Sequence, residues 1–160
     1  MIFLKPFNWK PYLFWIAFIE GIGLLSGLLT REGARLYNIY AVKPPLTPPA
    51  WVFPVVWAIL FGLMGVSAAR VFLSPASRAR SRAMAVFFLQ LAANVLWSLL
   101  FFNLQAYGAS FLWILVLWLL ITGTILAFAA VDRPAALLQL PYLLWVTFAA
   151  VLNFMVWLLN

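Results

Sequence analysis

Tryptophan side chains close to buried polar groups are the residues of this chain best suited to binding a ligand. Of the nine tryptophans, Trp97 follows Asn94 by one helical turn and Trp145 follows Tyr142 in the same way, each pair inside an apolar stretch. Aromatic walls with a few polar groups suit a flat, hydrophobic ligand. A buried indole N–H also needs an acceptor, so an equally open interpretation is that these rings only fill the interfaces between helices.

Glu20 is the one acidic residue that lies well inside an apolar stretch. Carboxylates within a membrane usually face a cavity or a partner, so Glu20 is a candidate site residue. The alternatives are a protonated side chain with a structural hydrogen bond, or a side chain that snorkels to the membrane surface. For Gln90, Asn94 and Asn153 the competing interpretation is hydrogen bonding between helices.

Composition excludes several classes of chemistry. The chain has no cysteine and no histidine, which excludes disulfides, thiolate chemistry and zinc or haem ligation by these side chains. It also lacks phosphate-binding glycine motifs and acid pairs at a workable spacing, so we expect no metal site and a binding protein rather than an enzyme. The net charge of +7 is concentrated in arginines between two apolar stretches, which favours contact with lipid head groups and argues against nucleic acid as a partner.

The apolar stretches that hold these residues are long enough to cross a membrane. Hydrophobic residues make up 68% of the chain and the mean hydropathy is +1.09. Residues 83–131 contain no charged side chain, and because one crossing needs about 20 residues, the polar patch at 103–108 divides this run into two spans. The sequence therefore predicts one all-α integral membrane domain over residues 1–160, a five-transmembrane-helix bundle. The predicted helices are 11–30, 51–72, 83–103, 107–130 and 135–158.

The first loop, residues 31–50, is predicted to be irregular and to end in a stiff, extended strap. Pro44, Pro45, Pro48 and Pro49 fix the backbone there. Such a strap could cap a cavity or merely connect two helices. Lysine and arginine are more numerous in the N-terminus, second loop and fourth loop, which include Lys5, than in the first loop. The positive-inside rule then predicts an N-terminus inside and a C-terminus outside.

Three segments resemble the TspO/MBR family of translocator proteins and bacterial tryptophan-rich sensory proteins. The first carries Lys43, Pro44, Pro48, Pro49, Trp51, Pro54 and Trp57. The second carries Asn94, Trp97, Phe101 and Phe102. The third carries Pro141, Tyr142, Trp145, Val151, Leu152 and Asn153. The order and spacing of the three motifs together are more specific than any one of them.

The resemblance implies a bundle, often a homodimer, whose first loop closes with Pro44, Pro48 and Pro49 over a ligand cavity. It implies protoporphyrin IX or a haem-like tetrapyrrole, a sterol or a drug-like molecule as ligand, with no required cofactor. The implied role is that of a sensor, scavenger or transporter in a bacterial cell membrane. The implied ligand-binding residues are Trp51, Phe53, Pro54, Val56, Asn94, Trp97, Trp145, Ala149 and Leu152, with Gly27 and Thr30 assigned without a sharp motif.

The chain departs from the family pattern at Leu46, where the family usually has a tryptophan linked to light-dependent porphyrin breakdown. Such an activity is an alternative function here, and Trp145 would be its remaining indole. The sterol-recognition segment of the family is also broken, since Phe154, Met155 and Leu158 occupy that region. A further alternative is an interaction subunit without a ligand of its own.

Overall fold

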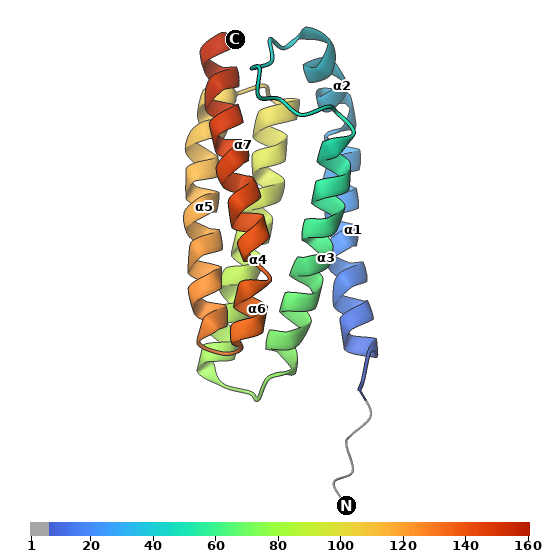
Figure 1. The fold of residues 1–160 in the computed structure, drawn as a ribbon, viewed down its shortest axis with the longest axis vertical. Helices are drawn as coiled ribbons and strands as arrows, with labels where there is room; N and C mark the ends of the chain where they lie inside the picture. Colours follow the sequence, from blue (N-terminus) through green and yellow to red (C-terminus); the bar gives the residue numbers. More distant parts are fainter. Residues whose placement is uncertain (1–6) are drawn as a thin grey trace, which may run out of the picture.

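The computed structural model describes residues 7–160, and every regular element in that range is helical (Figure 1). The Lys5 contribution to the predicted orientation lies outside the described residues. The elements are α1 (Lys10–Leu29), α2 (Arg31–Tyr40), α3 (Val52–Leu73), α4 (Arg78–Ser98), the π-helical turn η1 (Leu99–Asn103), α5 (Tyr107–Ala129), α6 (Arg133–Leu137) and α7 (Leu140–Leu159).

Five helical segments are long and apolar enough to cross a membrane, which confirms the predicted number of spans. They are Lys10–Leu29, Val52–Leu73, Arg78–Asn103, Tyr107–Ala129 and Arg133–Leu159. The third begins five residues earlier than predicted because Ser77 caps it, with its Oγ accepting from Arg80 N at 3.1 Å. A serine at this position satisfies an N–H that the first helical turn leaves unpaired.

Glycines bring α1 and α3 into close contact. A Cβ on Gly65 would lie 2.6 Å from Ile16 Cα, and a Cβ on Gly23 would lie 2.5 Å from the Phe61 ring. Small residues permit this approach between helices in lipid, where van der Waals contact drives association. Gly65 therefore serves packing within one chain. The other main contacts join α4 to α5, α5 to both α6 and α7, and α3 to both α4 and α6.

The structure corrects the prediction for the first loop. Residues 31–50 were expected to be irregular, but their first half forms the helix α2. Its charged face carries an ion pair between Glu32 and Arg35, one turn apart, and a Cβ on Gly33 would lie 2.5 Å from the Phe102 carbonyl oxygen. Tyr37 packs on the Phe101 ring at 5.2 Å between centroids. A short amphipathic helix on the end of the bundle is stabilised by such packing rather than by its own length. The extended strap is thus confined to the residues that follow Tyr40.

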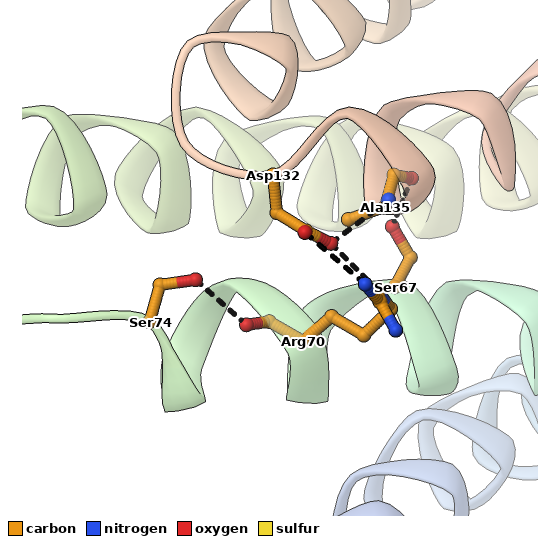
Figure 2. Close-up of polar contacts among 5 residues, drawn as sticks. All are labelled: Ser67, Arg70, Ser74, Asp132 and Ala135. Atoms are coloured by element: carbon orange, nitrogen blue, oxygen red, sulfur yellow. Dashed lines mark hydrogen bonds and ion pairs between the residues drawn. The ribbon is translucent and has the colours of Figure 1, made fainter.

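An ion pair joins α3 to the turn before α6 at the end of the bundle opposite the strap (Figures 1 and 2). Arg70 Nε and Nη2 donate to the Asp132 carboxylate at 2.6 and 3.1 Å. Asp132 also accepts from Ala135 N at 3.1 Å and so caps α6, while Ser67 Oγ donates to Ala135 O at 2.7 Å. The Arg70 hydrogen bonds, aided by the Ala135 N–H, lower the pKa of Asp132 against the opposing effect of burial.

Candidate functional site

The strap lies across the end of the bundle where α7 finishes (Figure 1). Pro44 is buried, Pro48 half-buried and Pro49 exposed. Thr47 closes a turn inside the strap, since its N and Oγ1 donate to Pro44 O at 3.0 and 2.7 Å. Lys43 Nζ donates to Asn38 O at 2.7 Å, which ties the strap to α2. The strap that contains Pro44, Pro48 and Pro49, the predicted lid residues, is therefore held in one conformation by hydrogen bonds.

A chain of buried hydrogen bonds connects α4 to α7. Asn94 Nδ2 donates to Tyr142 Oη at 2.6 Å, and Tyr142 Oη donates to Gln90 Oε1 at 2.9 Å. Gln90 Nε2 lies 3.9 Å from the sulfur of Met64 on α3. The interpretation of Asn94 and Gln90 as interhelical hydrogen-bonding residues is confirmed.

Trp97 joins a second polar connection between the same helices. Its Nε1 donates to Asn153 Oδ1 at 3.0 Å, and Asn153 Nδ2 donates to Tyr107 O at 2.9 Å. The Trp97 ring stacks on Phe101, with centroids 5.2 Å apart. Leu152, beside Asn153, is buried. Trp97 is thus buried and fully hydrogen-bonded, and its ring forms part of the helix interface.

Aromatic rings bridge α3 and α7. Phe53, in the first turn of α3, meets Trp145 edge to face at 5.8 Å. One turn further along α3, Trp57 stacks on Phe61 at 5.4 Å and meets the Tyr142 ring at 6.2 Å. The structure therefore brings together Phe53 and Trp145, and places both close to the polar chain through Tyr142.

The other predicted lining residues are dispersed. Trp51 is 68% exposed and Pro54 is also exposed, so both lie on the outside of the start of α3. Gly27 is exposed, and a Cβ there would have no atom within 4 Å. Thr30 is buried, but its Oγ1 donates to Ser26 O at 2.9 Å within the same helix turn. Val56 and Ala149 are half-buried against the core.

A match to the TspO/MBR family model covers residues 15–158. The chain belongs to the TspO/MBR family. It is 41% identical to "Tryptophan-rich protein TspO" of Chlorobaculum tepidum, over 87% of this chain and 89% of that protein. It is 39% identical to "Tryptophan-rich sensory protein" of Cereibacter sphaeroides, over 96% and 93% of the two chains. It is 33% identical to human "Translocator protein", over 93% and 89%. Family membership and five apolar helices establish an integral, multi-pass membrane protein.

Glu20 lies at the middle of α1 in this TspO/MBR protein and points along the seam with α3. A Cβ on Gly62 would lie 3.4 Å from Glu20 Oε1. Among residues 7–160 the Glu20 carboxylate has no hydrogen-bond or ion-pair partner within the usual distances. Gly62 lies more than two helical turns after Phe53 in α3. Glu20 as a site residue stays a prediction.

Two polar residues with structural prominence were not singled out from the sequence. Gln139 is fully buried at the start of α7, and within the described chain neither its Oε1 nor its Nε2 has a hydrogen-bond partner. A buried amide without partners is costly. Asn160 contacts the strap at Val42. Gln139 lies in the turn between α6 and α7, Asn160 follows the last residue of α7, and no motif marks either of them.

Burial raises the pKa of Tyr37 to about 12, with a further contribution from the nearby Tyr107 hydroxyl. Its hydroxyl therefore remains neutral and can donate a hydrogen bond at any physiological pH. Tyr37 lies among Phe101, Phe102 and Tyr107 beneath α2. The strap end of this family member thus combines a neutral phenol with a dense aromatic cluster.

Proposed function

We propose that this TspO/MBR protein binds a tetrapyrrole such as protoporphyrin IX between α3, α4 and α7, under the strap. The observation that carries the proposal is the edge-to-face contact of Phe53 with Trp145, next to the hydrogen-bonded Tyr142. Flat aromatic faces with a few polar groups are suited to a planar, hydrophobic macrocycle.

The way in which α3 and α7 meet supports the same proposal. Within residues 7–160 each of these helices packs closely on other helices, and they meet one another mainly through ring contacts such as Trp57 with Tyr142. Side chains can change rotamer without moving a helix. A planar ligand that enters between α3 and α7 would replace ring–ring contacts with ring–ligand contacts, so aromatic stacking is retained.

A sensing or transport role in a bacterial cell membrane accompanies the binding proposal. The names "Tryptophan-rich sensory protein" and "Translocator protein" of the relatives describe such roles for those proteins. The N-terminus inside follows from the excess of arginine at the end of the bundle that carries the turn between α3 and α4. The strap and its binding site would then face the outer side of the membrane. A homodimer is also part of the proposal.

Titration of the purified protein in detergent with protoporphyrin IX, followed in the dark by tryptophan quenching, tests the binding. We expect saturable quenching at micromolar concentration. In Trp145→Leu the affinity should fall about two- to tenfold, because one stacked aromatic contact contributes roughly 0.5–1.5 kcal/mol. Trp9→Leu is the matched control, since Trp9 is exposed before α1 and lies outside the interior. Equal affinities for both variants, or no saturation with the wild-type protein, would contradict the proposal.

A further inference from the structure

A groove lies between α5 and α6 at the end of the bundle opposite the strap. Its volume is about 350 Å³. The residues that line it are Ile125, Ala129, Arg133, Ala136, Leu137 and Leu140. All of them except Arg133 are apolar, so a long hydrophobic surface ends at a single guanidinium group.

The spacing of these residues explains the shape of the groove. Ile125 and Ala129 are one turn apart on α5, and Arg133, Leu137 and Leu140 follow at helical intervals along α6 and the start of α7. Residues three or four apart lie on the same face of a helix. The two rows therefore form parallel walls. Leu137, Leu140 and Ala129 are exposed on the outside of the bundle, where a membrane protein meets lipid.

Arg133 carries the open positive charge of this region. It is exposed, and within residues 7–160 it forms no ion pair and donates no side-chain hydrogen bond. The adjacent acid does not neutralise it, because Asp132 is held by Arg70 from α3 at 2.6 and 3.1 Å. Figure 2 shows the Asp132 carboxylate turned toward α3, whereas the groove lies against α5. An anion at Arg133 therefore meets a guanidinium whose neighbouring carboxylate is already paired.

We propose that this groove is a binding site for an anionic phospholipid, with an acyl chain along Ile125, Leu137 and Leu140 and the phosphate on Arg133. A guanidinium pairs with phosphate through two parallel hydrogen bonds. Arg133 is also the first residue of the fifth span, so we expect it to lie at the level of the lipid phosphates. Basic groups beside a groove between membrane helices are suited to anionic head groups.

The arginines of the neighbouring turn provide a control for non-specific attraction. Arg78 is exposed in the first turn of α4 and lines no part of this groove. Arg80 is already engaged, since its Nη1 donates to Phe72 O and Ser74 O at 3.1 and 2.8 Å. If anionic lipid were attracted only by the positive charge at this end of the bundle, Arg78 and Arg133 would contribute equally to binding. Because the groove contains Arg133 and not Arg78, a specific site predicts that only Arg133 contributes.

The test is thermal unfolding of the purified protein in detergent with added dioleoylphosphatidylglycerol or dioleoylphosphatidylcholine, together with native mass spectrometry to count bound lipid. A ligand that binds only the folded state raises the unfolding temperature. Phosphatidylglycerol should stabilise the wild-type protein and Arg78→Gln more than phosphatidylcholine does. In Arg133→Gln its apparent affinity should fall by about tenfold, the effect of losing a charge-assisted pair.

A second variant examines the apolar part of the site. Ala129→Phe fills the groove from an exposed position at the end of α5, so the fold should tolerate it, and phosphatidylglycerol should bind more weakly although Arg133 is intact. The proposal is overturned if Arg78→Gln weakens binding as much as Arg133→Gln, or if both lipids stabilise equally. It is also overturned if Ala129→Phe binds lipid as the wild-type protein does, or if inorganic phosphate alone reproduces the stabilisation.

Discussion

The side chain of Asn160 forms two hydrogen bonds with the backbone of Val42. Val42 N donates to Asn160 Oδ1, and Asn160 Nδ2 donates to Val42 O, both at 2.9 Å. Asn160 Nδ2 also donates to Val156 O at 2.9 Å within the last turn of α7. A carboxamide has both a donor and an acceptor, so it can pair with an extended residue as a neighbouring strand would. The start of the strap is thereby attached to α7, the helix that carries Trp145.

Replacing Asn160 by alanine should loosen the strap without unfolding the bundle. Each of the two hydrogen bonds contributes about 0.5–1.5 kcal/mol, so we expect the amides of residues 41–50 to exchange with solvent about tenfold faster. Hydrogen–deuterium exchange of the protein in detergent measures this. Asn160→Asp should give an intermediate rate, because the carboxylate keeps the acceptor for Val42 N but loses the donor to Val42 O.

The matched control for this variant is Gln105→Asn. Gln105 is exposed in the turn between α4 and α5, and its φ of 50° lies in the left-handed region that asparagine tolerates. Exchange in the strap should not change in this control. Unchanged exchange in Asn160→Ala would mean that other contacts, such as the one from Lys43 Nζ to Asn38 O, hold the strap in place.

The hydroxyl of Tyr142 should contribute measurably to stability. Tyr142→Phe leaves Gln90 Oε1 without its donor and Asn94 Nδ2 without its acceptor in a fully buried place. Interhelical hydrogen bonds in membrane proteins are worth about 0.6 kcal/mol on average and up to about 1.7, and an orphaned partner adds to the loss. We expect a loss of about 1–2 kcal/mol, measured by reversible unfolding in mixed micelles. Tyr40→Phe, at a position that is 76% exposed, should be neutral.

The number and order of the membrane spans could be predicted because charge is so sparse in this chain. The absence of charge from residue 83 to 131 and the single polar patch within it set two crossings directly. The helix α2 could not be predicted in this way. It has ten residues, and its stability comes from contacts such as Gly33 against the Phe102 carbonyl. A local hydropathy pattern does not report such long-range packing.

The candidate site was predictable by residue type but not by orientation. Asn94 and Trp97 are in one helix and three residues apart, yet Asn94 bonds to Tyr142 and Trp97 to Asn153. Which partner each finds depends on the rotation of α4 against α7, and uniformly apolar helices carry no periodicity that fixes it. Trp51, which the family resemblance implies as a ligand-binding residue, is 68% exposed.

Gly65 should be intolerant of any side chain. A Cβ there would lie 2.6 Å from Ile16 Cα, a backbone atom that cannot move aside without separating α1 from α3. We expect Gly65→Ala to lower the free energy of unfolding by about 1–3 kcal/mol, as overpacking does in other cores. Gly21→Ala is the control in α1, because a Cβ there has no atom within 4 Å, and alanine should stabilise this helix by up to about 1 kcal/mol. Equal stability of the two variants would disprove the close approach of the helices.

The ion pair between Arg70 and Asp132 should make stability depend on pH in the acid range. Hydrogen bonds from Arg70 hold the pKa of Asp132 below its ordinary value of 3.8. The unfolded chain therefore binds a proton more readily than the folded protein near that pH, so the contribution of the pair is complete above about pH 4 and disappears as the pH falls through the folded pKa. Asp132→Asn keeps an acceptor for Ala135 N but removes the charge.

The expected result is that the wild-type protein has the higher unfolding temperature at pH 7 and that the difference from Asp132→Asn closes below about pH 4. Because the chain has three acidic side chains, a change in stability in this pH range can be assigned to one of them by substitution. Glu32 also has a lowered pKa, through its hydrogen bonds from Arg35, but that pair is exposed on α2 and exposed pairs contribute little. Glu32→Gln should therefore follow the wild-type profile. The opposite outcome is a difference in unfolding temperature between the wild-type protein and Asp132→Asn that stays constant from pH 7 to pH 3. It would show that stability at this end of the bundle depends on how residue 132 caps α6 and not on the charge of Asp132.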